Sequence, residues 1–344
     1  MENSYSEKRS LAPAFSADAV PVVFASSNQF VPFFAACLKS LLNHISSHNL
    51  YDIVLIHQDV SEENQDTLRK MIRPYSNVSL RFFDAAPLIR GYGLKANAHI
   101  SVETYFRFLI QQILPGYDKV LYLDCDLIVN ADVAELYEIN VEDCLLAAVR
   151  DVEALGHLNG ANRKIQNYLS SGLGMRDPGG YFQAGVLLIN EARMRQTYSL
   201  EQWLTFAAVP HRYNDQDVLN LYCEGKVKYL DMSWNVLTDC DHTRVSNIVV
   251  HAPKEIQEAY REARIAPKII HYAGCQKPWQ KPTEDMAQYF WSASRETPYY
   301  EEALYQMALY AAKQCVLEDR RRRSPLWKAR RGVKKILSRF FRKG

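Results

Sequence analysis

The sequence of 344 residues predicts an α/β protein in which a doubly wound, mostly parallel sheet is flanked by helices. The first observation behind this prediction is a series of short, β-branched apolar runs, which are typical of buried strands. The second is that helix-like segments separate these runs at the spacing of strand–helix–strand units. The third is that acidic and polar residues follow several runs directly, at the strand ends where α/β sheets bind ligands.

Five elements are expected near the N-terminus, in the order strand, helix, strand, helix, strand. The strands are predicted at residues 20–25, 51–57 and 78–83, and the helices at residues 33–42 and after residue 61. Ser61 is expected to cap the second helix, because Glu62 and Glu63 follow it and carboxylates favour the positive end of the helix dipole. This alternation is the basis for the doubly wound sheet.

The rest of the chain continues the alternation with longer connections. Strands are predicted at residues 119–123, 184–189, 226–230 and 268–271, and helices at residues 101–114, from about 214, and from 286 onwards. Residues 151–180 are rich in glycine, and we expect a loop there that can act as a mobile flap over a site. The pattern from residue 286 is amphipathic and indicates a helical C-terminal region.

Four regions are expected along the chain. Residues 1–19 are polar and aperiodic and predict a disordered leader. Residues 20–282 form the main α/β domain, residues 283–319 a helical extension, and residues 320–344 a basic tail. The chain is long enough for a large core.

Composition narrows the class of protein. An apolar content of 48% and a mean hydropathy of -0.27 are typical of a globular protein. No secretory signal and no apolar run of membrane-spanning length is apparent in the sequence. The seven cysteines are widely spread and form no C-x-x-C pair, which favours reduced thiols in a cytosol over a disulfide framework or a zinc site.

The net charge of +2 conceals a strong asymmetry. Residues 320–344 carry twelve Lys or Arg and no acidic residue, so the rest of the chain has 29 basic and 39 acidic residues. Within residues 326–341, apolar and aromatic side chains fall near one helical face. A basic amphipathic helix of this kind is typical of a segment lying on an anionic membrane. Nucleic acid makes no use of an apolar stripe, and a solvated tail is the remaining alternative.

The pair Asp124 and Asp126 is the first candidate for chemistry. The two aspartates follow the apolar strand at residues 119–123. In an extended chain, side chains at i and i+2 point the same way, so both carboxylates can hold one hard divalent cation that neutralises a diphosphate. A D-x-D triplet is a short motif, and a solvated turn at the strand end is the alternative.

Two other acidic clusters have simpler interpretations. Asp239, Cys240, Asp241 and His242 resemble a metal cluster, but no apolar strand is evident directly before them, which favours a turn. The simplest interpretation of the segment 214–220 is the start of a helix, with Asn214 as the cap and two aspartates at the positive end of the helix dipole. Polar side chains at such a start can also reach the hydroxyls of a sugar.

The segment 271–279 follows the last predicted strand and combines three useful groups. His271 can be a third metal ligand through an imidazole nitrogen. Gly274 permits close approach of the backbone to a phosphate, and Lys277 supplies a cation. A single histidine at a strand end is also common as a structural residue, which is the alternative for His271.

Five segments in this order resemble glycosyltransferase family 8, and in particular the bacterial lipooligosaccharide galactosyltransferases and lipopolysaccharide glucosyltransferases. They are VPVVFASSNQFVPFFAACLKSLL, ISVETYFRFLIQQILPGYDKVLYLDCDLIV, YFQAGVLLIN, YNDQDVLN and HYAGCQKPW. The resemblance covers residues 20–282, and its D-x-D and H-x-x-G-x-x-K-P-W motifs are specific when taken together. It implies a GT-A catalytic domain, a UDP-hexose donor, Mn²⁺ (or Mg²⁺) and retention of the anomeric configuration.

The resemblance also implies roles for individual residues. The metal ligands would be Asp124, Asp126 and His271, and the residues around the donor would be Ala25, Ser27, Asn28, Arg107, Gln183, Gly274 and Lys277. Arg107 would approach the diphosphate or the donor sugar. Asp215 would bind sugar hydroxyls, and Gln216 would lie near the anomeric carbon. With Arg107, these two residues are the expected catalytic residues.

Two departures from the family pattern bear on the donor. Ser26, Ser27 and Asn28 replace an acidic pair that often follows the first strand, which removes a carboxylate from the nucleotide pocket. Gln183 stands where the family usually has Asn and places a longer side chain beside the donor sugar. Both departures concern the identity of the donor more than the activity.

The sequence therefore predicts a retaining hexosyltransferase that transfers glucose or galactose from a UDP-sugar to a lipid-linked bacterial surface glycan, either lipopolysaccharide, lipooligosaccharide or capsule. It is expected to lie on the inner face of the cytoplasmic membrane, bound there through residues 320–344. Because Gln216 is a poor amide nucleophile, same-face attack by the acceptor is favoured over a covalent intermediate. The alternatives are a transferase acting on a protein glycan and a non-catalytic nucleotide-sugar-binding protein associated with a membrane.

Overall fold

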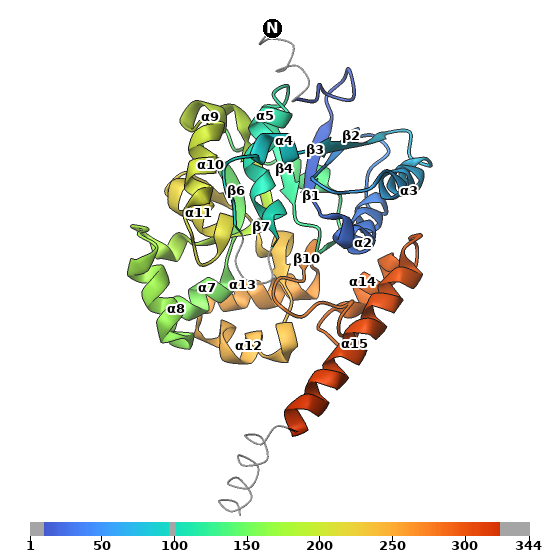
Figure 1. Ribbon diagram of the computed structural model, residues 1–344. Coiled ribbons are helices and arrows are strands. Elements are labelled where there is room, and N and C mark those ends of the chain that lie inside the picture. The colour runs from blue at the N-terminus through green and yellow to red at the C-terminus, as the bar shows by residue number, and fades with distance from the viewer. Residues whose placement is uncertain (1–9, 96–100, 324–344) are drawn as a thin grey trace, which may run out of the picture.

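The computed structural model describes residues 10–95 and 101–323, and its centre is a seven-stranded sheet (Figure 1). The strand order is β3-β2-β1-β4-β7-β6-β8. These strands are β1 Val20–Ala25, β2 Tyr51–His57, β3 Val78–Asp84, β4 Lys119–Leu123, β6 Leu146–Arg150, β7 Phe182–Asn190 and β8 Val227–Tyr229. Neighbouring strands are parallel except at β7, which runs antiparallel to both β4 and β6. The expected mixed, mostly parallel sheet is confirmed.

A second, three-stranded sheet lies beside the first and has the order β5-β10-β9. Its strands are β5 Leu127–Val129, β9 Val236–Leu237 and β10 Ile269–His271. The antiparallel pairing of β10 with β5 sets His271 opposite Leu127, and the backbone N–H of Tyr272 donates to the carbonyl of Asp126 at 3.1 Å. This pairing brings the end of β10 to the turn that follows β4.

Helices cover both faces of the large sheet (Figure 1). From the N-terminus they are α2 Val31–Leu42, α3 Glu62–Ile72, α4 Ala86–Ile89, α5 Ile110–Ile113, α6 Val133–Tyr137, α7 Val152–Gly156, α8 Arg163–Asn167, α9 Glu191–Thr197, α10 Leu200–Ala208, α11 Asn214–Tyr222, α12 Arg244–Asn247, α13 Lys254–Ile265, α14 Ala287–Ser294 and α15 Tyr300–Arg323. Short 3₁₀ and π segments join several of them, among them η3 Val102–Leu109, η4 His157–Ala161, η5 Tyr168–Gly172 and η8 Cys240–His242.

Side chains of each strand point alternately to the two faces of the sheet and contribute to an apolar layer on each face. In β1, Val22 and Phe24 belong to the same buried cluster as Leu38 of α2, whereas Val23 belongs to the cluster on the opposite face that contains Leu109 and Trp203. These side chains are almost fully buried, and at about 25 cal/mol per Å² of apolar area each large one stabilises the fold by about 2 kcal/mol. A strand that is buried on both faces therefore has an unbroken apolar run as its sequence.

The C-terminal region is helical, as expected. The helix α14 packs against α2, and α15 runs past them and projects away from the domain (Figure 1). Residues 311–317 of α15 are exposed on every side. Among the residues that the structure describes, no helix combines the length and apolarity needed to cross a membrane. Of the predicted basic tail at residues 320–344, residues 320–323 form the end of α15, and residues 324–344 lie outside the described residues.

The predicted strands at residues 20–25, 51–57 and 119–123 agree with the structure at both ends. Ser61 caps α3 as expected, because its hydroxyl accepts from the backbone N–H of Asn64. The predicted helix at 101–114 is mainly a 3₁₀ helix, η3, and only its last turn is α-helical.

Residues 151–180 differ from the expected loop. They contain α7, α8 and short π and 3₁₀ turns, and their apolar side chains pack around Leu169 and Tyr181. Asp151 caps α7 and Asn162 caps α8 through side-chain oxygens that accept backbone N–H groups, which is how glycine-rich sequence still forms short helices here.

Two further differences concern helix starts and the leader. Asn214 is not the cap of α11; it is the first residue, with φ +50°, and the cap is Tyr213, whose N–H donates to the carboxylate of Asp217 at 2.7 Å. In the segment expected to be a disordered leader, residues 10–19 instead pack on the domain. There the N–H of Leu11 donates to the Ile113 carbonyl at 2.7 Å. Residues 1–9 lie outside the described part of the chain.

Candidate active site

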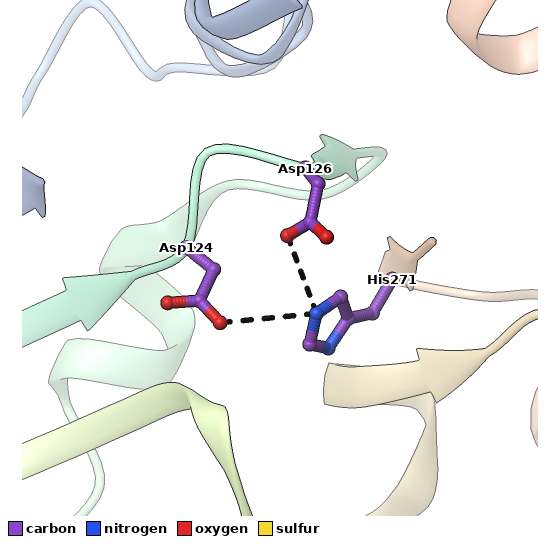
Figure 2. Close-up of side chains that lie close together, drawn as sticks. All are labelled: Asp124, Asp126 and His271. Carbon is purple, nitrogen blue, oxygen red and sulfur yellow. Dashed lines mark ion pairs between the residues drawn. The ribbon is translucent and has the colours of Figure 1, made fainter. Parts of the chain in front are cut away.

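The turn after β4 carries Asp124 and Asp126, and the end of β10 carries His271 (Figure 2). The Nε2 atom of His271 lies 3.8 Å from Oδ2 of Asp124 and 3.3 Å from Oδ1 of Asp126. One ligand atom from each residue falls within 4.8 Å of the others. The two aspartates are close in sequence, but only the pairing of β10 with β5 brings the histidine to them.

A buried hydrogen bond fixes the orientation of the imidazole. Nδ1 of His271 lies 3.0 Å from Oδ1 of Asn235, which is 3% exposed. Because a carbonyl oxygen only accepts, the proton belongs on Nδ1, and Nε2 presents its lone pair toward the carboxylates. This is the tautomer that a metal ligand requires.

Lys277 lies on the other side of Asp126. Its Nζ atom is 2.5 Å from Oδ2 of Asp126 and also donates to the Tyr272 carbonyl at 2.6 Å. Burial, the largest single influence, acts to raise the pKa of Asp126, but the charge of Lys277 and the neighbouring His271 outweigh it and lower that pKa well below its usual range. Asp126 is therefore held as a carboxylate.

The donor set fits a hard divalent cation. Two carboxylates and one neutral imidazole nitrogen are ligands that Mn²⁺ and Mg²⁺ accept, with open positions for the oxygens of a substrate. In the structure, the ammonium of Lys277 provides the positive charge beside Asp126.

Arg107 links this cluster to the start of α11. Its Nη2 is 2.9 Å from Oδ1 of Asp124, and its Nε is 3.0 Å from Oδ2 of Asp215. The guanidinium also donates to the Ala184 carbonyl and lies over the Tyr122 ring, 4.2 Å from its centroid. The side chain is 3% exposed, so its charge is balanced by the two carboxylates rather than by water.

Asp215 is buried between Arg107 and Thr104, whose hydroxyl donates to Oδ1. Burial raises the pKa of Asp215 to about 6, although Arg107 and Thr104 act in the opposite direction. Two of the expected catalytic residues thus form one buried ion pair, and its position beside Asp124 links the start of α11 to the candidate metal ligands.

Asp151 holds two glutamines that also line the cavity. Its Oδ2 accepts from Nε2 of Gln183 at 3.2 Å and from Nε2 of Gln216 at 3.0 Å, while Oδ1 accepts the N–H groups of Glu153 and Ala154. These contacts occupy both carboxylate oxygens. Asp151 therefore acts as an anchor that fixes which way the two amides point.

The carbonyl oxygen of Gln216 is itself engaged. Oε1 accepts the backbone N–H of Ala184 at 3.1 Å, and Nε2 makes a further 3.3 Å contact with the Tyr181 hydroxyl. An oxygen held in a hydrogen bond is a weaker nucleophile than a free one. The local geometry thus disfavours attack by the Gln216 amide.

Two glycines make room for the cluster. A Cβ atom on Gly185 of β7 would come within 2.8 Å of Oδ2 of Asp124 and would overlap the ring of His271. Gly274 has φ +119°, and a Cβ there would lie 3.1 Å from both Arg244 Nη2 and Cys240 Sγ. Both positions therefore require glycine, the second for its backbone conformation as well.

One cavity of about 440 Å³ connects these groups. Of the residues that the sequence predicted for the site, those that line it are Ala25, Ser27, Arg107, Asp124, Asp126, Gln183, Asp215, Gln216, His271, Gly274 and Lys277. Asn28 is not among its described lining residues. Its side-chain oxygen instead accepts from the Ser61 N–H at 3.0 Å and from Asn64 Nδ2 at 2.8 Å, which joins the segment after β1 to the start of α3.

The other acidic groups have structural partners. Asp217 accepts from the hydroxyls of Tyr168 at 2.7 Å and Tyr181 at 2.6 Å. The predicted turn at residues 239–242 is present as η8, although it follows the two-residue strand β9. There Asp241 pairs with Lys281 at 2.8 Å.

Sequence reasoning missed several residues that shape the cavity: Thr104, Asp151, Glu153, Tyr181, Gly185, Asn235 and Arg244. Asp151 directly follows β6, an apolar run that the sequence analysis did not identify as a strand. Recognising that strand would have placed Asp151 at a strand end, as for Asp124. Arg244 and Asn235 gave no comparable signal, because their partners lie far away in the sequence.

Comparison with known proteins extends these findings. A putative glycosyltransferase of Haemophilus influenzae is 25% identical over 268 residues, which is 76% of this chain and 73% of the relative. The lipopolysaccharide 1,2-glucosyltransferase of Escherichia coli is 27% identical over 207 residues, 58% of this chain and 53% of that enzyme.

The solved apo structure of WbbM, a bifunctional glycosyltransferase, has a TM-score of 0.78 and 30% identity, and the match covers 87% of this chain and 53% of that one. The chain thus spans about half the length of WbbM and of the Escherichia coli enzyme. The expected GT-A fold is confirmed. The model of Glycosyl transferase family 8 matches residues 21–283, which is more than half of the chain. The chain belongs to glycosyltransferase family 8.

Proposed function

We propose that this protein is a retaining hexosyltransferase that transfers glucose or galactose from a UDP-sugar to a lipid-linked bacterial surface glycan. The observation that carries the proposal is the position of Asp124, Asp126 and His271 in the same cavity as Arg107 and Asp215. A diphosphate needs a cation, and a hexose needs fixed polar partners. The cavity offers both within one connected space.

The donor is proposed to lie along the cavity with its uridine near Ala25 and Ser27. Its diphosphate would then meet the ammonium of Lys277 and the backbone of Gly274. When bound, a divalent ion such as Mn²⁺ supplies Lewis-acid stabilisation of charge on the departing UDP. Lys277 adds to that stabilisation from a position that is 14% exposed, where charges are weakly screened.

The donor hexose is proposed to lie against Asp215 and the two amides that Asp151 holds. Asp215 accepts from sugar hydroxyls, and Arg107 keeps its carboxylate in place. Gln183 has its Nε2 directed to Asp151, so its carbonyl oxygen is the atom offered to the sugar. This contact with Asp151 holds the longer glutamine side chain at position 183 in place.

Retention of configuration is proposed to occur by same-face attack. The alternative, a covalent intermediate on Gln216, is disfavoured because Oε1 of Gln216 accepts the Ala184 N–H. In the proposed step, the bond from the anomeric carbon to the diphosphate oxygen breaks and the acceptor oxygen bonds to the same face. The released UDP oxygen takes the acceptor's proton, so no protein base is needed.

The proposed acceptor class rests on the relatives and on the tail. One relative is a lipopolysaccharide glucosyltransferase, and lipopolysaccharide is lipid-linked. Residues 320–344 have the composition of an interfacial helix, and we propose that they hold the enzyme on the inner face of the cytoplasmic membrane. Confining enzyme and acceptor to one surface raises the rate at which they meet.

The test of the donor is UDP release from a panel of UDP-sugars with Mn²⁺. Release from UDP-glucose or UDP-galactose, abolished by EDTA and by Asp126→Asn, is the expected result. Asp241→Asn is the matched control, because Asp241 is an aspartate paired with lysine outside the cavity. Folded protein that neither releases UDP nor binds it would refute the proposal.

The test of the membrane contact uses the full chain and vesicles. We expect it to sediment with vesicles that contain anionic phospholipid and to remain in solution with purely zwitterionic ones. A chain of residues 1–319 should lose this sedimentation while keeping UDP binding. Equal sedimentation of both chains with anionic vesicles would contradict the role of the tail.

A further inference from the structure

The cavity extends beyond the residues proposed to bind the donor. On that side it is lined by Glu153 and His157, which follow β6, and by Arg244 at the start of α12. We call these three residues the Glu153 wall. None of them belongs to the motifs that carry the family resemblance.

Each of the three guanidinium nitrogens of Arg244 donates a hydrogen bond to another group of the protein. Its Nε donates to Oε2 of Glu153 at 2.7 Å, its Nη1 to the Thr238 carbonyl, and its Nη2 to the Ala273 carbonyl at 2.7 Å. The side chain is 6% exposed. The guanidinium thus ties three segments together through three of its five N–H groups, and its charge is paired with Glu153.

Glu153, in contrast, keeps a carboxylate at the cavity. Its side chain is 35% exposed, and its Oε1 lies 3.6 Å from Nε2 of His157. Burial acts to raise the pKa of Glu153, but the contact with His157 and the charge of Arg244 outweigh it and lower the pKa to about 2. The carboxylate is therefore ionised, and each oxygen retains a lone pair beyond its one protein contact.

A second carboxylate, that of Asp151, also lines this end of the cavity. The carboxylate of Asp151 lies beside Glu153 in sequence, and its oxygens are occupied by backbone and amide donors. The ammonium of Lys277 is paired with Asp126. Among the cavity-lining residues that the structure describes, the cations near Glu153 are thus already paired with protein acceptors.

We propose that the Glu153 wall is the acceptor subsite, where Glu153 binds the hydroxyl groups of a neutral sugar and excludes a sugar that carries a carboxylate. The proposal rests on the proposed function, because it assigns the remaining wall of the same cavity to the second substrate. A hydroxyl that donates to an ionised carboxylate makes a strong, charge-assisted hydrogen bond. A second carboxylate there would meet the like charge of Glu153, and the charge of Arg244 is already paired with Glu153.

The experiment measures binding to the full chain saturated with UDP and Mn²⁺. The probes are methyl β-D-glucoside, methyl β-D-galactoside and methyl β-D-glucuronide, and binding is followed by calorimetric titration. We expect the neutral glycosides to bind at least about tenfold more tightly than the glucuronide. In Glu153→Gln this preference should fall to about twofold or less, with UDP affinity unchanged. Glu135→Gln, which alters a surface pair with Lys268, should retain the full preference.

The outcomes separate this proposal from the proposed function. If UDP and Mn²⁺ fail to bind, the proposed function itself is wrong. If they bind, but the wild-type chain binds no glycoside, binds the glucuronide as tightly as the neutral sugars, or keeps its preference in Glu153→Gln, the acceptor subsite is wrong. Loss of the preference in Glu153→Gln alone supports it.

Discussion

The Nδ1 atom of His271 lies 3.0 Å from the side-chain oxygen of Asn235. Asn235 ends the short helix η7 Met232–Asn235, directly before β9, and β9 pairs with β10 in parallel. Two neighbouring strands of the small sheet thus place a hydrogen-bond acceptor behind the imidazole. The contact sets the tautomer of a residue that lies 36 positions away in the sequence.

The first prediction concerns this contact. Asn235→Ala removes the acceptor, so the imidazole loses its fixed orientation, and we expect Mn²⁺ affinity to fall roughly 10–100-fold. Asn235→Asp keeps an oxygen at the same place and should restore most of the affinity. Calorimetric titration of Mn²⁺ measures both. Equal affinity of the wild type and Asn235→Ala would show that Asn235 does not position His271.

Gly185→Ala should abolish the metal site without unfolding the domain. The added methyl group would overlap the His271 ring and approach Oδ2 of Asp124 to 2.8 Å, so the two ligands must move apart. We expect no measurable Mn²⁺ binding, with a loss of unfolding free energy of about 1–3 kcal/mol from overpacking. Gly172→Ala is the control, because its nearest contact is the side chain of Tyr168 at 3.3 Å. Wild-type Mn²⁺ affinity in Gly185→Ala would contradict the crowding argument.

Asp151→Asn should affect turnover more than donor binding. The substitution removes the charge that accepts from both Gln183 and Gln216, so the two amides are no longer fixed against the donor sugar. We expect kcat to fall by about 10²-fold, with the affinity for UDP changed by less than about threefold. Steady-state kinetics and UDP titration separate the two effects. A rise in KM with unchanged kcat would assign Asp151 to binding instead.

Glu191 provides a test of pH dependence outside the proposed site. It is the first residue of α9 and is 2% exposed, and its Oε2 has no hydrogen-bond partner in the described part of the chain. Burial raises the pKa of Glu191 to about 8, although the charge of Arg195 acts to lower it. In the unfolded chain the pKa returns to about 4.3.

The folded state therefore binds more protons between these two values, and the contribution of Glu191 to stability is full below pH 4 and lost as the pH rises through 8. We expect the difference in unfolding free energy between Glu191→Gln and the wild type to grow in favour of the variant across this window, by at most about 5 kcal/mol. Urea unfolding at several pH values measures it. A difference that is independent of pH would mean that Glu191 is already ionised in the fold.

The order of strands and helices was predictable because buried strands and amphipathic helices have local patterns. The strand at 119–123 is an unbroken apolar run that ends in Asp124, so both the element and its ligand were apparent. The short strands β5 and β9 were missed because two or three residues carry no period. The helices in 151–180 were missed because their caps, Asp151 and Asn162, lie in glycine-rich sequence.

The sequence by itself determined the fold class, the family and most residues of the candidate site, because these depend on side-chain type and on spacing along one strand or turn. The tertiary structure alone decided which of these groups meet. The β10–β5 pairing brings His271 to Asp126, and folding buries Arg107 between Asp124 and Asp215. The tertiary structure also directs the side chain of Asn28 to α3 rather than to the cavity. It brings Asp151 and Arg244 to the cavity and Asn235 to the candidate ligand His271. Such contacts join residues tens to more than a hundred positions apart, and no local pattern encodes them.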